Sequence, residues 1–187
     1  MARKSILEVT ESHFREVVFR RHSVRTFTDE EVPDGVVEDC VRLAQCSPSA
    51  CNRQAVRVHV YSVKRDIEAI LQRQNGNQGF GGGVNKLVLL TYDSRAILSS
   101  SERNLPYLDA GLFAMTFLYA LESKNVASCC LNLSNYWFRD LALRRVCGIP
   151  VWERPILLIA IGHPPPSYHV PVSARPRAKT ILQFHNV

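Results

Sequence analysis

Apolar residues recur with helical spacing in several stretches of the chain. The clearest stretch lies between Asp34, which can cap a helix, and Pro48, which stops one, and its apolar residues repeat about every 3.6 positions. Weaker patterns of the same kind predict helices over residues 9–20, 65–74 and 135–146. Gly148 is a suitable residue for ending the last of these helices, because glycine adopts the left-handed conformation without strain.

Three further stretches predict strands, and a fourth predicts a central helix. Residues 56–61 alternate apolar and polar side chains, as a strand with one buried face does. Residues 87–92 and 155–161 are nearly continuous apolar runs, which is typical of central strands covered on both faces. Residues 106–124 would form a helix that is apolar almost all round and therefore buried. We expect an α+β fold with a mixed or mainly antiparallel sheet.

Length and composition limit the class of protein. The 187 residues fit a single domain spanning residues 1–187, and the hydrophobic content of 46% and charged content of 21% are ordinary for a folded protein. There is no run of 18 apolar residues, and residues 1–6 lack the apolar segment of a signal peptide. We therefore expect a cytoplasmic protein with no membrane partner. The six cysteines show no Cys-x-x-Cys spacing, so we expect no metal site.

The net charge of +6 is concentrated at the two ends of the chain. Residues 1–25 carry six basic against three acidic residues, residues 139–187 carry seven against two, and the middle carries ten against twelve. This distribution suits a fold in which both ends approach an anionic ligand, and a modest nucleic-acid binder shows it too. Because no basic run is interleaved with aromatic residues and no nucleic-acid motif is present, we expect no nucleic-acid partner.

Two polar motifs, one expected helix apart, point to a ligand pocket. Residues 20–27, Arg-Arg-His-Ser-Val-Arg-Thr-Phe, place three guanidinium groups and a hydroxyl within six residues, which suits a phosphate. Residues 47–54, Ser-Pro-Ser-Ala-Cys-Asn-Arg-Gln, form a turn whose backbone groups and short amide side chains can reach the polar edge of a flat heterocycle. We expect the two motifs to form two walls of one pocket.

Later segments of the chain extend this pattern. They are residues 104–111, Asn-Leu-Pro-Tyr-Leu-Asp-Ala-Gly, residues 125–132, Asn-Val-Ala-Ser-Cys-Cys-Leu-Asn, and a closing stretch that runs from Ile149-Pro150 to Ser173-Ala174-Arg175. In this order, the segments and the two motifs resemble the FMN-dependent nitroreductase family over most of the chain. The Asn- and Gly-rich residues 75–83 resemble the subgroup found beside polysaccharide-synthesis genes.

The resemblance implies a role for each group of residues. The phosphate of FMN would bind to Arg21, Ser23 and Arg175, while His22 would either face the phosphate or simply pack. Arg25 would lie beside N1 and the C2 carbonyl of the flavin and tune its redox chemistry. Because the flavin itself would carry the reaction, the resemblance does not identify a catalytic side chain. Further contacts to the flavin would come from Pro48, Ser49, Ala50 and Asn52, from Asn77 on a partner-facing wall, and from Cys130, Leu131 and Asn132 as they pass the ring.

Each of these groups also fits a plainer role. The arginines can form a solvated basic cluster, and residues 48–52 can form an ordinary turn after a helix. Residues 130–132 can be a plain strand, and Asn77 can simply shape its loop. Asp109 is an acid on an apolar helix, and we expect it to anchor a backbone group or an arginine.

Fold, activity and assembly are also implied by the resemblance. Family members have a three-layer α/β/α arrangement around a mixed, mainly antiparallel sheet, and they form intertwined homodimers with FMN at the interface. The implied activity moves hydride from NADH or NADPH to flavin N5 and then passes electrons to an electron-poor small molecule, such as a nitroaromatic or a quinone. Many members have Pro-Trp where this chain has Ala55-Val56, and lysine where it has Ser173. A dedicated FMN-dependent oxidase or flavin-modifying enzyme, and a non-catalytic flavin-binding protein, therefore stay open as alternatives.

Overall fold

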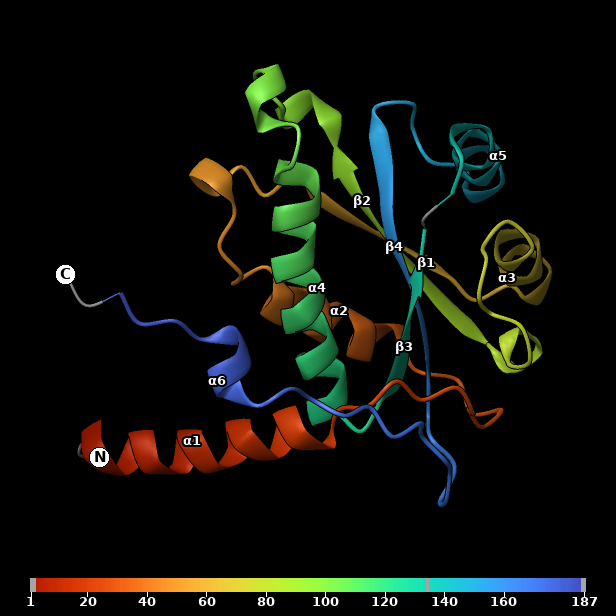
Figure 1. Cartoon of the computed structure of the whole chain (residues 1–187). Helices are drawn as coiled ribbons and strands as arrows, with labels where there is room; N and C mark the ends of the chain where they lie inside the picture. The colour runs from red at the N-terminus through yellow and green to blue at the C-terminus, as the bar shows by residue number, and fades with distance from the viewer. Residues whose placement is uncertain (1–2, 134, 186–187) are drawn as a thin grey trace.

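The computed structural model describes residues 3–133 and 135–185, which form a four-stranded sheet between two layers of helices (Figure 1). The α-helices are α1 (Arg3–Arg20), α2 (Asp34–Ala44), α3 (Lys64–Leu71), α4 (Leu105–Ser123), α5 (Trp137–Cys147) and α6 (Ala178–Ile181). The strands are β1 (Val56–Tyr61), β2 (Lys86–Asp93), β3 (Ala127–Asn132) and β4 (Glu153–Gly162). The short 3-10 helices are η1 (Ala50–Asn52), η2 (Gly81–Gly83), η3 (Ser94–Ala96) and η4 (Ser100–Glu102).

The sheet has the order β1-β2-β4-β3, and each of these pairings is antiparallel. Parallel pairing occurs, within the described residues, only as an isolated bridge between Ser23 and Ser128. The register shifts between Leu90 and Thr91, opposite Pro155, whose missing N–H cannot take part in a regular ladder. The expected α+β class and mainly antiparallel sheet are confirmed, and the mixed character is limited to one bridge.

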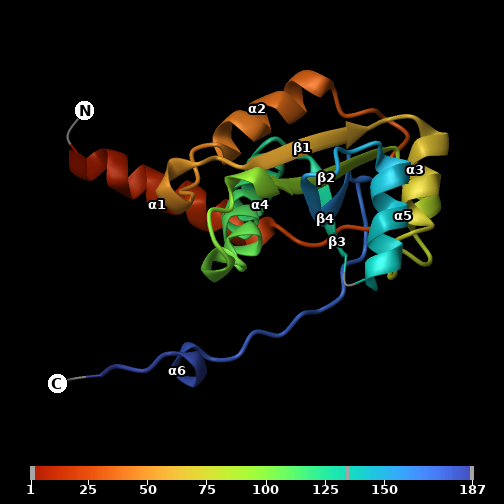
Figure 2. The same cartoon turned by 90° about the horizontal axis from the view of Figure 1, so that it is seen from above.

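Strand β2 shows why both faces of the sheet are covered. Val88 and Leu90 pack in one apolar cluster with α2 and α4, whereas Leu87 and Leu89 pack in another with α3 and α5. Successive side chains of a strand point to opposite faces, so β2 serves both clusters. Seen from above, α2 and α4 lie on one side of the sheet and α3 and α5 on the other (Figure 2). This burial explains the continuous apolar run in the sequence of β2.

Helix α2 is present as predicted, but Asp34 does not cap it. Pro33 is the N-cap, and Asp34 is the first helical residue. The Oδ1 atom of Asp34 accepts a hydrogen bond from Lys86 Nζ at 2.6 Å, which ties α2 to the start of β2. Gly148 ends α5 with a φ of 63°, as its place in the sequence predicts.

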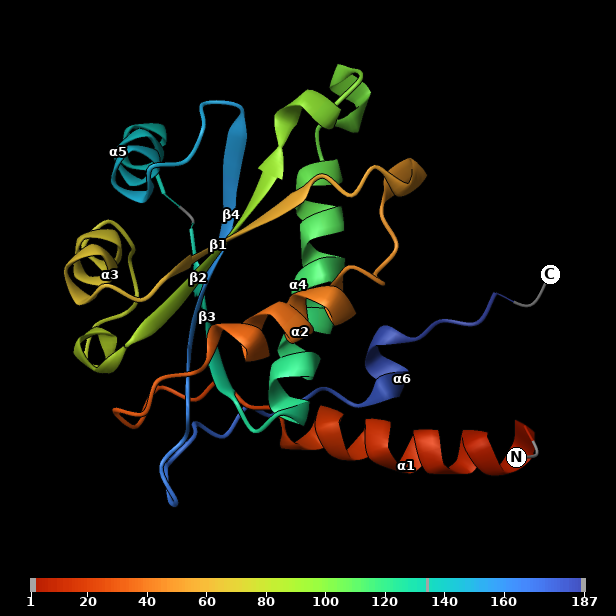
Figure 3. The ribbon, with the colours of Figure 1, turned by 180° about the vertical axis from the view of Figure 1, so that it is seen from behind.

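Helix α4 is buried on one side only, although its sequence predicted burial all round. Seen from behind, α2 crosses α4, and η1 lies beside the N-terminal half of α4 (Figure 3). The opposite side of α4 exposes Tyr107, Leu108, Gly111 and Leu112. The tail after β4 extends away from the sheet (Figure 2) and exposes Val172, Ile181, Leu182 and Phe184. No helix of the described residues has the length and apolar character needed to span a membrane.

Candidate functional site

The loop after α1 is held against the edge strand β3. Val24 N donates a hydrogen bond to Ser128 O at 3.0 Å, and Ser23 pairs with Ser128 in the parallel bridge. The side chain of Val24 is buried, whereas Ser23 is half-buried and Arg25 is exposed. The backbone of the loop is therefore fixed, while its polar side chains stay accessible to a ligand.

This loop and the C-terminal tail enclose a small pocket of about 110 Å³. In the tail, Arg175 Nη1 donates to Ser173 O at 3.1 Å, and in the loop His22 Nδ1 donates to Arg20 O at 2.6 Å. The structure thus brings together residues from opposite ends of the sequence, as predicted. The polar side chains that line the pocket are those of Arg21, His22, Ser23, Arg25, Ser173 and Arg175.

The pocket carries positive charge that no acidic side chain balances. Its lining contains three arginines and no acidic residue. In the part of the chain that the structure describes, no carboxylate forms an ion pair with Arg21, Arg25 or Arg175. Guanidinium groups without a carboxylate partner are favourable phosphate ligands, because they offer a permanent charge and a planar pair of donors. The residues fit the phosphate group of a nucleotide such as FMN.

Arg25 lies where the pocket meets the Gly-rich loop and β3. Its Cζ atom is 6.0 Å from the centre of the Phe80 ring, and its Nη1 atom is 3.5 Å from Ser23 O. Burial raises the pKa of the Cys129 thiol, and the positive charge of Arg25 opposes that shift. The positive charge of Arg21 acts in the same direction on the thiol of Cys130, the next residue of β3, so both arginines lie close enough to influence this strand.

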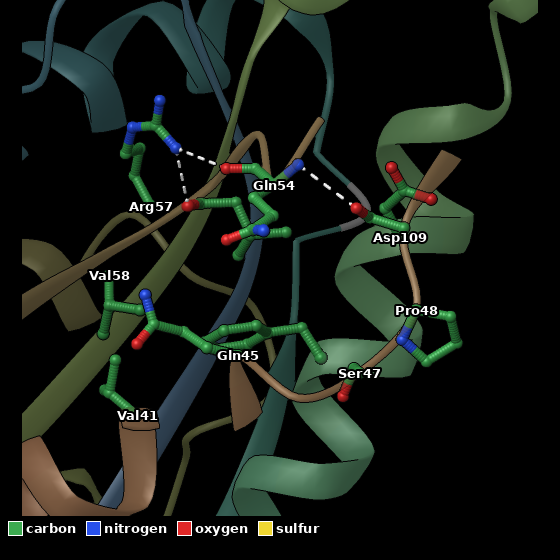
Figure 4. A pocket seen from close by; sticks show the side chains of 11 residues that line it. Val41, Gln45, Ser47, Pro48, Gln54, Arg57, Val58 and Asp109 are labelled. Carbon is green, nitrogen blue, oxygen red and sulfur yellow. Dashed lines mark hydrogen bonds between the residues drawn. The ribbon is translucent and has the colours of Figure 1, made fainter. Parts of the chain in front are cut away.

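The second motif lines a different pocket, of about 310 Å³, beside α4 (Figure 4). Pro48 and Ser49 line it together with apolar residues of β1 and α4, whereas Ala50 and Asn52 lie in η1 and do not. Asp109, which is 2% exposed, accepts hydrogen bonds from Ala50 N at 3.2 and 3.4 Å. The expectation that Asp109 anchors a backbone group is confirmed.

The two motifs line different pockets within a single chain, so their meeting in one pocket stays a prediction that requires a second chain. The loop after α1 is anchored near the C-terminal end of α4, where Arg20 Nε lies 3.4 Å from Glu122 Oε1. In contrast, η1 is anchored by Asp109, near the N-terminal end of α4. Asp109 and Glu122 are 13 positions apart, or about 20 Å at the α-helical rise of about 1.5 Å per residue. Figures 1 and 3 show the loop after α1 near the C-terminal end of α4 and the segment after α2 beside its N-terminal half.

The remaining predicted residues lie at the end of β3 and in the Gly-rich loop. Cys130 and Asn132 are exposed, whereas Leu131 is buried in the core and can reach a ligand only through its backbone. The side chain of Asn77 is turned into its own loop, where Nδ2 donates to Leu71 O at 2.8 Å and to Gln74 O at 3.0 Å. The amide nitrogen of Asn77 therefore shapes its own loop, and a contact of Asn77 with the flavin stays a prediction.

The contacts that hold η1 in place could not be recognised from the sequence. Arg53 Nη1 and Nη2 each lie 2.8 Å from an oxygen of Glu102. Arg53 belongs to the second motif, but Glu102 lies 49 positions later, in η4. No motif spacing links two residues that are brought together only by the packing of η4 beside η1.

The chain matches known proteins over most of its length. Residues 18–78 and 62–163 match the model of the Nitroreductase family, so the chain belongs to this family. A protein of Archaeoglobus fulgidus assigned as an NADH dehydrogenase/NAD(P)H nitroreductase is 25% identical over 155 residues, which cover 79% of this chain and 83% of that protein. These matches support a flavin oxidoreductase as the general class of the protein.

Solved structures share the fold. The nitroreductase family protein from Streptococcus pneumoniae TIGR4 is similar with a TM-score of 0.80 and 21% identity, over 92% of this chain and 100% of that chain. The FMN-dependent nitroreductase from Clostridium difficile R20291 is similar with a TM-score of 0.76 and 16% identity, over 91% of this chain and 98% of that chain. The predicted nitroreductase-like fold is confirmed.

Proposed function

We propose that this protein is an FMN-dependent oxidoreductase that uses NADH or NADPH to reduce an electron-poor small molecule, such as a nitroaromatic or a quinone. The observation that carries the proposal is the pocket of three arginines whose charge no acidic lining residue balances. Bound FMN would supply the hydride and electron transfer, while the protein supplies binding, orientation and electrostatics. The similar C. difficile protein is named as FMN-dependent, which supports this choice of cofactor.

In this proposal the charged residues have separate tasks. Arg21, Ser23 and Arg175 bind the phosphate, because they line the pocket as hydrogen-bond donors. Arg25 faces the pyrimidine edge of the flavin, where a cation stabilises the negative charge that forms on reduction. The exposed end of β3 at Cys130 and Asn132 passes the ring.

We also propose that the protein is a homodimer in which each site combines the arginine pocket of one chain with η1 of the other. Within one chain these two groups are attached to opposite ends of α4, so a ligand that touches both needs a second copy of the chain. Exposed apolar side chains on α4 and on the tail also need cover. They include Leu108 and Leu112 on α4 and Ile181 and Phe184 in the tail.

Steady-state oxidation of NADH and NADPH by the purified protein, with and without menadione, tests the activity. We expect a yellow protein that releases FMN on denaturation and oxidises the nucleotide faster when menadione is present. Release of FAD alone, or no flavin binding after reconstitution, would contradict the proposal. Bound FMN without turnover would favour the non-catalytic alternative, and turnover of another substrate without NAD(P)H would favour the dedicated oxidase.

Mixed dimers test the shared site. One chain would carry Arg21→Ala with Arg175→Ala, and the other would carry Ala50→Trp, which adds a bulky side chain to η1. If the site is shared, each mixed dimer keeps one intact site and binds flavin, although neither homodimer does. If both walls come from one chain, the mixed dimer has no intact site and stays colourless. A monomer of about 21 kDa that binds FMN, measured by light scattering, would also contradict the dimer.

A further inference from the structure

The loop that contains η1 has a strained backbone. Cys51, Asn52 and Gln54 have φ angles of 50°, 53° and 50°, in the left-handed region that residues other than glycine rarely adopt. Within the described residues, Asn125 is the one other non-glycine residue with a positive φ. Such strain persists only where surrounding contacts hold it, and it concentrates at functional sites.

Core packing does not account for this strain. None of the three residues of η1 is buried, so the left-handed conformation does not place an apolar side chain in the core. The loop instead uses polar contacts of its own, in which Gln54 N donates to Ser49 Oγ at 3.1 Å and Gln54 Nε2 donates to Asn52 Oδ1 at 3.0 Å. The strained conformation therefore shapes an exposed surface.

Two anchors outside the loop hold that surface in place. The first is Glu102, whose two oxygens each accept a hydrogen bond from Arg53 at 2.8 Å, while Arg53 Nη1 also donates to Ala96 O at 2.9 Å. Arg53 and Glu102 are only 16% and 22% exposed, and a two-pronged guanidinium–carboxylate contact fixes orientation as well as distance. The second anchor is the buried carboxylate of Asp109, which holds Ala50 N.

We propose that Glu102 and Asp109 are positioning residues, which hold the strained loop so that residues 49–52 present their polar groups to the flavin ring. This inference rests on the proposed function and adds two residues to its site. Glu102 acts through Arg53 and Asp109 acts through Ala50, so neither residue needs to touch the ligand. Loss of either anchor lets the loop relax toward ordinary backbone angles, which moves the ring contacts and leaves the arginine pocket unchanged.

Limited proteolysis with trypsin tests the first anchor without any ligand. Trypsin cleaves after arginine, and Arg53 is protected while its side chain is held by Glu102. Glu102→Gln should raise the rate of cleavage after Arg53 on the order of tenfold, because local opening controls cleavage. Glu38→Gln is the matched control, since Glu38 forms an exposed 2.6 Å ion pair with Arg42 on α2, away from the loop. Equal rates in the two variants would overturn the role of Glu102.

Flavin titrations test what the anchors position. Because the loop is proposed to contact the ring, Glu102→Gln should weaken the binding of FMN and of riboflavin, which lacks the phosphate, by the same factor of roughly ten. Arg21→Ala should weaken the binding of FMN far more than the binding of riboflavin.

Variants of Asp109 test the second anchor. Asp109→Asn keeps an oxygen that accepts a hydrogen bond from Ala50 N, so it should bind flavin more tightly than Asp109→Ala. Unchanged riboflavin binding in Glu102→Gln, or equal affinities in the two Asp109 variants, would overturn the proposal. If the natural chain binds no flavin, the proposed function fails, while the proteolysis still decides whether Glu102 holds the loop.

Discussion

The ammonium group of Lys86 lies 2.6 Å from Asp34 Oδ1, although the Lys86 side chain is 1% exposed and the Asp34 side chain is 89% exposed. A second carboxylate oxygen, Glu31 Oε1, lies 3.3 Å from the same ammonium group. The pair joins the first residue of α2 to the first residue of β2. Loss of one member is not equivalent to loss of the other. A buried charge without a partner costs much free energy, whereas an exposed charge without a partner is solvated by water.

Asp34→Asn should therefore destabilise the fold more than Lys86→Met does. In the first variant the amide oxygen can still accept a hydrogen bond from Lys86 but carries no charge, so the buried ammonium group keeps only the carboxylate of Glu31, and we expect a loss of about 1–3 kcal/mol in the free energy of unfolding. The second change removes the buried charge and leaves Asp34 in water, so its cost should be smaller. Urea unfolding measures both values, and a larger loss for Lys86→Met would contradict this account.

Gly162, the last residue of β4, has no room for a side chain. A Cβ atom at this position would lie 2.8 Å from two carbons of the Phe27 ring. Gly162→Ala should therefore lower the free energy of unfolding by about 1–3 kcal/mol, because the ring or the strand must move. Gly35→Ala is the control, since nothing lies within 4 Å of a Cβ atom there and alanine favours the helix by about 0.5–1 kcal/mol. If thermal unfolding shows Gly162→Ala to be more stable than Gly35→Ala, the Phe27 ring can move aside at little cost in free energy.

The arginine pocket predicts which side chains retain FMN. Arg21→Ala and Arg175→Ala should each weaken FMN binding by about 1.5–3 kcal/mol, the usual range for a hydrogen bond to a charged group, without changing the fold. Arg177→Ala is a suitable control, because Arg177 is in the same tail but does not line the pocket. Titration of each of the three variants with FMN, followed by flavin fluorescence, gives their affinities for FMN. Equal flavin retention in all three variants would remove Arg21 and Arg175 from the phosphate site.

Arg25 should affect the redox chemistry of the flavin more than its retention. A cation beside the pyrimidine edge favours the anionic reduced flavin, so Arg25→Gln should lower the two-electron potential by a few tens of millivolts, where about 30 mV corresponds to about 1.4 kcal/mol. Reduction by NAD(P)H should slow accordingly. A spectroscopic redox titration measures the potential. A variant that keeps the natural potential but loses its FMN would show that Arg25 binds the phosphate.

Most elements of the fold could be predicted from the sequence, because burial leaves a periodic pattern. Strand β2 was expected over residues 87–92 and spans Lys86–Asp93, and its ends are polar residues whose pairing no apolar pattern records. The helix expected over residues 9–20 begins at Arg3. Asp34 was a plausible cap, but its carboxylate instead pairs with a lysine 52 positions away. Local chemistry could not reveal this long-range partner.

The candidate site was predictable in its residue types and not in its geometry. The motif around Arg21 and Ser23 and the distant Arg175 do meet in one pocket. Within one chain the two motifs line separate pockets, because α4 lies between them, and sequence order does not show this separation. The anchor Glu102 left no signal either, since it is one of many surface acids until folding brings it to Arg53.

The ion pair between Arg53 and Glu102 makes a prediction about acid. The hydrogen bonds from Arg53, followed by one from the backbone N–H of Leu98, lower the pKa of the Glu102 carboxyl from its ordinary value of 4.5 to about 2. A carboxyl whose pKa is lower in the folded state stabilises the fold above its unfolded pKa, and the contribution is lost as the pH falls through the folded value. The melting temperature of the natural chain should therefore exceed that of Glu102→Gln at neutral pH. The difference in melting temperature should hold down to about pH 5 and shrink between about pH 4.5 and pH 2.

Glu38→Gln is the control for this prediction. It should differ less from the natural chain at every pH, because the ion pair of Glu38 is exposed. A difference between the natural chain and Glu102→Gln that is undiminished at pH 2 would mean that packing, and not the ion pair, holds η1 in place.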